Sequence, residues 1–94
     1  MVQDGAYEWD PRKAISNLEK HGVAFEDVVG FHWDEALVIP DRRQEYGEPR
    51  FLAYGLIGSR LHALVFTPRS GRIRVISLRK ANSREVRRWL MSRR

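Results

Sequence analysis

Three short apolar segments in the second half of the chain limit its possible folds more than any other feature. They span residues 50–56, 61–67 and 72–79, and the turn signals Gly58-Ser59 and Pro68-Arg69-Ser70-Gly71 separate them. Turns this short join neighbouring antiparallel strands, because parallel strands need a crossover of about a dozen residues or more. The pattern therefore predicts an antiparallel meander. A further apolar segment at residues 36–39 adds a fourth strand.

Helix signals lie on both sides of this predicted sheet. Asp10 and Pro11 are typical of an N-cap and the first helical residue, and Gly22 is typical of a C-terminal cap. We therefore expect a helix from Pro11 to about His21. Its apolar stripe at helical spacing consists of Ala14, Ile15 and Leu18.

Two further helices are expected. One covers residues 25–31, where Phe25, Val28 and Val29 fall on one helical face. The other begins near the C-terminus, because Asn82 and Glu85 have the spacing of a capping box. The apolar residues of this C-terminal helix are Val86, Trp89 and Leu90.

These elements predict an α+β fold with two N-terminal helices, a curled antiparallel sheet of about four strands and a C-terminal helix. Residues 1–94 are expected to form a single domain, because no linker composition divides so short a chain. The absence of cysteine excludes disulfides and a thiolate nucleophile. No apolar run approaches the roughly 18 residues of a membrane span, and residues 1–10 lack the apolar region of a signal peptide, so we expect a cytoplasmic protein without membrane contact.

Charge is distributed unevenly along the chain. Residues 1–48 hold five Lys/Arg and eleven Asp/Glu, a net charge of −6, whereas residues 49–94 hold twelve Lys/Arg and one acid, a net charge of +11. Fourteen of the seventeen basic residues are arginines, which favour bidentate contacts to phosphate or carboxylate. A nucleic acid or an acidic protein is therefore the expected partner.

Lys20 and His21 lie at the predicted end of the first helix. Two interpretations stay open. Positive side chains stabilise a helix C-terminus through its dipole, so the role of the pair is then structural. Alternatively, the imidazole transfers a proton while the ammonium contacts a phosphate.

The segment Arg72–Lys80 alternates basic and apolar residues. In a regular strand the even-numbered residues, among them Arg74 and Lys80, point to one side, and the odd-numbered residues, among them Arg79, point to the other. The basic side is either a solvated surface that protects against aggregation or a floor that binds phosphates. With regular pairing Arg74 and Arg79 cannot share a face, so a joint role requires a β-bulge or a strand end between them.

Other candidates are weaker. Glu48 and Arg50 form either a surface ion pair or a carboxylate base beside an arginine that it orients. His32 and His62 lack metal-ligand spacing to other His, Asp or Glu residues, so we expect no metal site and no cofactor. Gly55 and Gly58 indicate a strand bulge and a turn.

A basic surface without a cysteine nucleophile suits RNA cleavage through the 2′-hydroxyl of the substrate. The nucleophile then belongs to the RNA, and the protein supplies only a base, an acid and cations for the charge that develops on phosphorus. Arginine, lysine, histidine and one glutamate meet this need.

The sequence resembles the BrnT-type toxins of bacterial type II toxin–antitoxin systems. The resemblance covers Tyr7 to Trp89 and depends on the order and spacing of several motifs. They are Tyr7-Glu8-Trp9-Asp10-Pro11, Lys13-Ala14, Asn17-Leu18-Glu19-Lys20-His21-Gly22-Val23-Ala24-Phe25, Glu48-Pro49-Arg50, Tyr54-Gly55, Arg72 through Asn82, and Arg84-Glu85. The chain departs from the family at Leu78 and Trp89, where a small residue and a tyrosine are common.

The resemblance implies a RelE-like fold and a metal-independent endoribonuclease that inhibits translation. It also implies a ribbon-helix-helix antitoxin that neutralises the toxin and through which operator DNA is bound indirectly. The positions that match the family suggest a catalytic set of Lys20, His21, Glu48, Arg50, Arg74 and Arg79. Further RNA contacts are expected from Arg69, Arg72, Lys80 and Arg84. The alternative is a basic module that binds nucleic acid or the antitoxin without catalysis.

Overall fold

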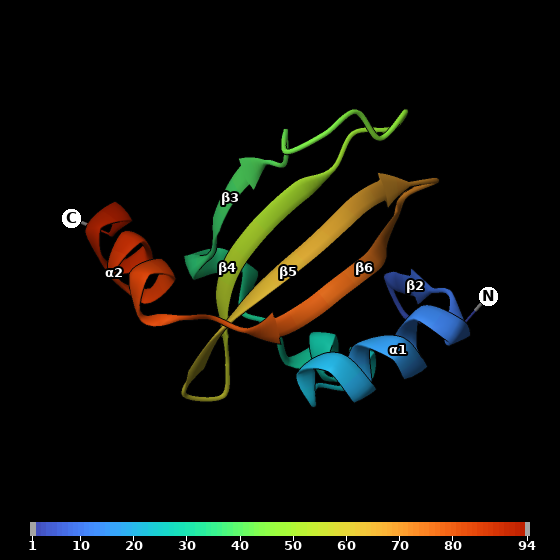
Figure 1. Ribbon diagram of the computed structural model, residues 1–94, viewed down its shortest axis with the longest axis horizontal. Coiled ribbons are helices and arrows are strands. Elements are labelled where there is room, and N and C mark those ends of the chain that lie inside the picture. The colour runs from blue at the N-terminus through green and yellow to red at the C-terminus, as the bar shows by residue number, and fades with distance from the viewer. Residues whose placement is uncertain (1, 94) are drawn as a thin grey trace.

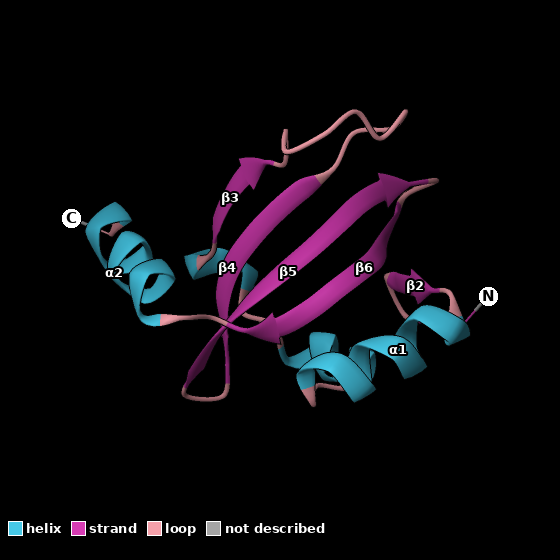
Figure 2. Ribbon diagram, in the orientation of Figure 1, coloured by secondary structure: helices cyan, strands magenta, loops and turns pink. Residues whose placement is uncertain are grey.

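A computed structural model describes residues 2–93, which form a mixed sheet with two α-helices and two short 3-10 helices (Figures 1 and 2). The α+β class is confirmed, as is the C-terminal helix. The elements in chain order are β1 (Val2–Asp4), β2 (Tyr7–Trp9), α1 (Pro11–His21), η1 (Phe25–Gly30), η2 (Trp33–Glu35), β3 (Leu37–Pro40), β4 (Phe51–Ile57), β5 (Arg60–Arg69), β6 (Arg72–Lys80) and α2 (Ser83–Ser92).

The sheet has the strand order β1-β2-β6-β5-β4-β3. The predicted meander is confirmed, because β4, β5 and β6 pair antiparallel in sequence order and β3 pairs with β4. The prediction of about four antiparallel strands is wrong in both number and direction. A hairpin of β1 and β2 extends the sheet to six strands, and β2 pairs parallel with β6. Strands of three residues are too short to show an alternating pattern.

The predicted helix caps are confirmed. The Asp10 side chain accepts a hydrogen bond from the Arg12 backbone N–H at 2.8 Å, and Gly22 ends α1 with a φ of 70°. Asn82 and Glu85 form the expected capping box at the start of α2, with both reciprocal hydrogen bonds present. Local sequence chemistry therefore determines where both α-helices begin.

Helix α1 borders the edge of β6 through a polar residue. The side-chain amide of Asn17 donates to the Leu78 carbonyl at 2.7 Å, and its oxygen accepts from the Leu78 N–H at 3.2 Å. Asn17 thus takes the hydrogen-bonding place of a neighbouring strand. The predicted apolar stripe is wrong in part: Ala14 packs on the core, whereas Ile15 and Leu18 are 62% and 51% exposed.

The expected second helix is a 3-10 helix, η1, without a side-chain N-cap. Phe25 and Val28 are fully buried as predicted, but Val29 is 58% exposed. A tighter turn of three residues eclipses side chains at i and i+3, so the first two of these residues share the buried side and Val29 does not.

The structural role of Gly55 in β4 differs from the predicted one. The register of β4 and β5 is regular through Gly55, so the expected bulge is absent from this hairpin. A Cβ atom at this position would lie 2.5 Å from Cζ of Phe31, whose ring packs directly on the strand. Gly55 therefore makes room for the Phe31 ring. Gly58, with a φ of 61°, forms the predicted turn.

The two faces of the sheet are covered differently. On the apolar face, residues such as Leu64 and Leu78 join Trp9 and Phe25 in the larger core beneath α1 and η1. On the opposite face, Trp89 of α2 packs over Tyr54 and its neighbours at one end of the sheet. Figure 1 shows α2 beside the end of β3 and β4, whereas α1 lies beside β6.

A β-bulge in β6 decides which side chains share this second face. The pairing shifts between Val65 and Phe66, which oppose Ser77 and Val75, so Ile76 is the extra residue. Residues paired directly across antiparallel strands share a face. Arg74 and Arg79 oppose Thr67 and Ala63, two odd-numbered residues of one strand, and therefore lie on the same face. The β-bulge that a joint role of Arg74 and Arg79 requires is therefore present, and it inverts the regular alternation between the two residues.

Candidate nucleic-acid interface

The bulge gathers basic side chains on one side of the sheet. We call this side the arginine face and define it by Arg74, Ser77 and Arg79 of β6 together with Thr67 and Val65 of β5. Arg69 and Arg72, which pair with each other at the far end of this hairpin, continue the same side. A cluster of planar cations on one surface suits a phosphate backbone.

Arg79 is held by α2. Its guanidinium makes two hydrogen bonds of 2.8 Å to the carboxylate of Glu85, and the Tyr54 hydroxyl donates to the same carboxylate at 3.2 Å. The Arg79 guanidinium lowers the pKa of Glu85 to about 2, with further help from the Asn82 N–H. Glu85 correspondingly raises the pKa of Arg79, against the opposing effects of burial and of the nearby Arg43. The charged form of both groups is therefore favoured.

Arg74 is held by the N-terminal strand. Its guanidinium lies 3.3 Å from the carboxylate of Glu8, which is 7% exposed. The parallel pairing of β2 with β6 sets Glu8 opposite Arg74, so the contact depends on a strand that sequence analysis did not predict. The Arg74 side chain keeps a defined position near Thr67 and Ser77 on the arginine face.

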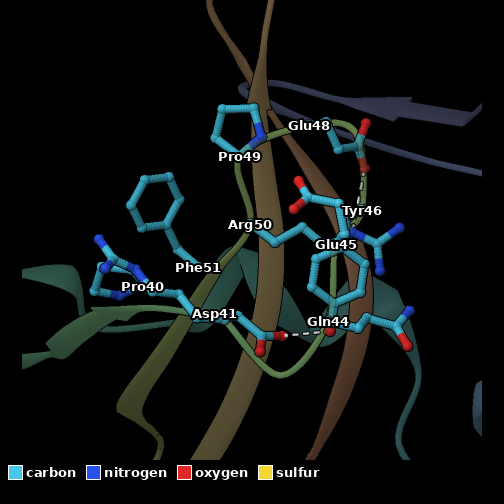
Figure 3. A pocket seen from close by; sticks show the side chains of 10 residues that line it. Pro40, Asp41, Gln44, Glu45, Tyr46, Glu48, Pro49, Arg50 and Phe51 are labelled. Carbon is cyan, nitrogen blue, oxygen red and sulfur yellow. Dashed lines mark hydrogen bonds and ion pairs between the residues drawn. The ribbon is translucent and has the colours of Figure 1, made fainter.

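Arg50 lies in the loop between β3 and β4. Its Nε atom is 3.2 Å from the Glu48 carboxylate, and its Cζ atom lies 4.1 Å from the centroid of the Tyr46 ring. The neighbouring Asp41 pairs with Arg43 at 2.7 Å, which lowers the pKa of Asp41 to about 2. Arg50, Glu48, Tyr46 and Asp41 line a cavity of about 570 Å³ (Figure 3).

Lys20 and His21 lie at the end of α1, which borders the edge of β6. They line a cavity of about 170 Å³ together with Ser77, a residue of the arginine face. Burial, with Lys20 and Arg79 nearby, lowers the pKa of His21 below its usual value. A neutral imidazole at physiological pH can accept a proton.

The remaining predicted contacts lie at the ends of the arginine face or away from it. Arg69 is exposed at the β5–β6 turn, and Arg72 donates from there to the Gly5 carbonyl. Arg84 is exposed on the first turn of α2. Lys80 pairs with His62 and therefore points away from the arginine face, so the structure does not bring it together with Arg74 and Arg79.

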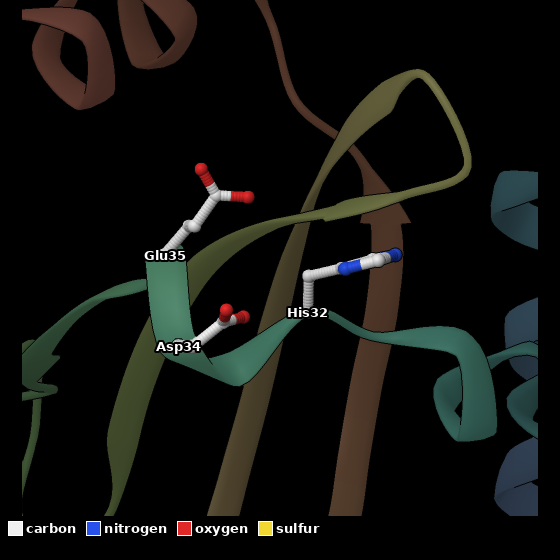
Figure 4. Close-up of side chains that lie close together, drawn as sticks. All are labelled: His32, Asp34 and Glu35. Carbon is white, nitrogen blue, oxygen red and sulfur yellow. The ribbon is translucent and has the colours of Figure 1, made fainter.

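One group of possible metal ligands occurs among residues 2–93, although the spacing of His32 had suggested none. Ligand atoms of His32, Asp34 and Glu35 lie within 4.8 Å of one another around the exposed η2 turn (Figure 4). Glu35 already forms an ion pair of 2.9 Å with Arg93. These exposed side chains lie outside the arginine face.

The model of the family "Ribonuclease toxin, BrnT, of type II toxin-antitoxin system" matches residues 9–85. The chain belongs to the BrnT family. A comparison with curated proteins finds no match. Membership means a ribonuclease toxin of a type II toxin–antitoxin system, with RNA as its target and an antitoxin as its partner at the level of the family. Among residues 2–93 there is no helix long and apolar enough to cross a membrane.

The BrnT match explains the motif order, but several residues that build the interface were not foreseen. Glu8, Tyr54 and Glu85 fix the positions of Arg74 and Arg79, and Asn17 seals the edge of β6. Glu85 carried a signal as a capping residue, yet its pairing with Arg79 depends on how α2 docks. Glu8 belongs to a motif of the family, but the sequence does not indicate its pairing with Arg74, which is 66 residues away.

Proposed function

We propose that this chain cleaves RNA on the arginine face, by a metal-independent reaction in which the 2′-hydroxyl of the substrate attacks the adjacent phosphate. The observation that carries the proposal is the bulge in β6. It gives Arg74 and Arg79 a common face, with Ser77 between them, beside the cavity that contains His21. Membership of a ribonuclease toxin family supports the same substrate.

The reaction needs little from the protein. As the 2′-oxygen forms its bond to phosphorus, the bond from phosphorus to the 5′-oxygen breaks, which leaves a 2′,3′-cyclic phosphate and a 5′-hydroxyl. Negative charge on the phosphoryl oxygens rises in the transition state. Arg74 and Arg79, with Arg50 at the loop, are proposed to stabilise that charge, because prepositioned cations need no reorganisation during the reaction.

Two protons move in this scheme. The 2′-hydroxyl loses one to a base, and the 5′-oxygen of the leaving group gains one from solvent water. His21 is the proposed base, since its lowered pKa keeps the imidazole neutral near pH 7. Lys20 is proposed to contact a phosphate from the same cavity, and Glu48 to orient Arg50 through their ion pair.

The partners follow from the same proposal. We propose that a ribbon-helix-helix antitoxin neutralises the chain and connects it to operator DNA, and that the toxin acts on RNA in the cytoplasm. Coexpression with the adjacent reading frame tests the partner. Growth inhibition should disappear, and the two proteins should copurify.

The cleavage proposal is tested with a short RNA in the presence of a metal chelator. Wild-type protein should release products with a cyclic phosphate and a 5′-hydroxyl, and an RNA with 2′-deoxyribose at the cleaved position should stay intact. Arg74→Ala and Arg79→Ala should each lower kcat by about 10²–10³-fold, the usual loss for one charge-stabilising group. Arg12→Ala is the matched control, because this exposed arginine of α1 lies outside the arginine face.

The cleavage proposal fails if free and ribosome-engaged RNA both stay intact with the protein and if Arg74→Ala and Arg79→Ala inhibit growth as strongly as wild type. Binding of RNA with steep salt dependence but without product would instead support the non-catalytic module.

A further inference from the structure

The β3–β4 loop, residues 41–50, encloses a cavity at the border of the arginine face. Its volume of about 570 Å³ lies within the roughly 300–1,000 Å³ typical of sites for small organic groups. Pro40, Pro49 and Phe51 provide apolar walls, and Arg50 is also part of the lining. The Thr67 hydroxyl of the arginine face donates a hydrogen bond to the Pro49 carbonyl, so the cavity adjoins that face.

Two planar groups are already stacked in this cavity. The Arg50 guanidinium lies 4.1 Å from the centroid of the Tyr46 ring, and Figure 3 shows both side chains together among the residues of the lining. The Tyr46 hydroxyl donates to Asp41 at 3.3 Å, which fixes the ring at the other end. Aromatic rings and arginine planes are the surfaces on which proteins stack unpaired RNA bases.

The polar side chains of the cavity suit a nucleobase better than a phosphate group. The lining contains three carboxylates, those of Asp41, Glu45 and Glu48, against the two guanidinium groups of Arg42 and Arg50. Asp41 and Glu48 are paired with arginines, whereas Glu45 makes no hydrogen bond or ion pair with any residue in the range 2–93. A free carboxylate only accepts hydrogen bonds, so it requires a ligand with N–H donors.

We propose that this cavity binds one unstacked nucleobase of the RNA substrate, guanine in preference to adenine, beside the phosphate contacted by Arg50. The inference rests on the proposed function, because it assumes that RNA lies along the arginine face. The base stacks on the Tyr46 ring. Guanine has adjacent N1–H and N2 amino donors on its Watson–Crick edge, which match the two oxygens of the Glu45 carboxylate, whereas adenine has a single amino donor there.

The stacking contact is tested by binding rather than by cleavage. Fluorescence anisotropy measures the affinity of purified protein for 2′-deoxy-substituted RNAs that carry a single guanine at successive positions. At one position Tyr46→Ala should weaken binding by about 5- to 100-fold, the usual range for one stacked base. Tyr46→Phe keeps the ring and should bind like wild type. An RNA with an abasic site at that position should bind wild type and Tyr46→Ala equally.

The hydrogen-bonding contact is tested with Glu45→Gln, a change at an exposed residue without partners. The preference of wild type for guanine over adenine at the same position should fall by about fivefold or more, as expected for loss of a bidentate contact to a base. Affinity for the abasic RNA should stay unchanged. Equal effects of Tyr46→Ala on guanine and abasic RNAs, or no effect on either, would overturn the proposal.

The same preparations separate this inference from the cleavage proposal. RNA cleavage by wild type with no difference between guanine and abasic RNAs would refute the base site and leave the reaction standing. The reverse result, a base-dependent loss of binding in Tyr46→Ala without cleavage of any RNA, would keep the base site and refute the reaction. If a basic peptide binds in the cavity without displacing RNA, then the RNA does not occupy the cavity, and this result would also refute the nucleobase site.

Discussion

The two faces of the sheet use the same strands but hold their side chains by different means. On the apolar face Leu64, Val75 and Leu78 are fixed by close packing, and each is at most 1% exposed. On the arginine face Arg74 and Arg79 are fixed by carboxylates from β2 and α2. Packing makes the first face the main source of stability, whereas the partly buried ion pairs of the second face hold two guanidinium groups in defined positions. One strand thus carries an apolar core side and a charged side.

Leu78 and Arg79 provide the strongest test of this contrast, because they are adjacent in β6 and point to opposite faces. Leu78→Ala removes a fully buried side chain and should lower the free energy of unfolding by about 2–5 kcal/mol. Arg79→Ala should cost less, about 1–2 kcal/mol, because Glu85 loses the ion pair that lowers its pKa but keeps its bonds to Asn82 and Tyr54. Urea denaturation of both variants gives these values. Similar losses would show that the arginine face is structural.

The caps and the meander could be predicted from the sequence because they depend on local chemistry. Asp10, Gly22, Asn82 and Glu85 act within a few residues, and the turns after β4 and β5 are short. For the arginine face, the sequence predicts which residue types are present but not which of them share a face. The bulge at Ile76 inverts the alternation of side chains along β6, and the residue type at that position does not predict a bulge.

Exposed apolar residues show why the stripe of α1 was predicted wrongly. Helical periodicity identifies apolar residues on one side, but it does not reveal what the helix packs against. Here the free edge of β6 offers backbone groups instead of a flat apolar surface, so Asn17 is buried and Leu18 is not. The backbone groups at the sheet edge therefore decide which side of the helix is buried, and the apolar pattern of the helix does not.

Asn17 gives the next largest expected effect, at the boundary between the two faces. Asn17→Leu keeps the number and branching of the side-chain heavy atoms but leaves the N–H and the carbonyl of Leu78 without their side-chain partner. Because an unpaired buried backbone group is costly, the free energy of unfolding should fall by about 1–3 kcal/mol. Hydrogen exchange of the Leu78 amide should accelerate in the same variant. An unchanged exchange rate would mean that Asn17 does not seal this edge.

The carboxylate of Glu85 predicts a smaller effect that depends on pH. Its pKa falls from 4.5 to about 2 on folding, mainly through Arg79. A lowered folded-state pKa contributes stability that is present above about pH 4.5 and is lost as pH falls towards 2. Over that window wild type should lose more stability than Glu85→Gln, by on the order of 1–2 kcal/mol. If the difference in unfolding free energy between the two proteins is the same at pH 5 and at pH 3, the ion pair of Glu85 with Arg79 does not stabilise the fold as proposed.

The smallest expected effect compares two cations of β6 on opposite faces. Arg74→Ala and Lys80→Ala each remove one positive charge, so their long-range effect on RNA attraction is the same. Only Arg74 faces the proposed path of the RNA, because Lys80 pairs with His62 on the other side. Each phosphate contact to a single strand contributes about 0.7 to the slope of log affinity against log salt. Arg74→Ala should reduce that slope by about this amount, and Lys80→Ala should leave it unchanged. Equal reductions would mean that RNA contacts both sides of β6, and the bulge would then lose its functional meaning.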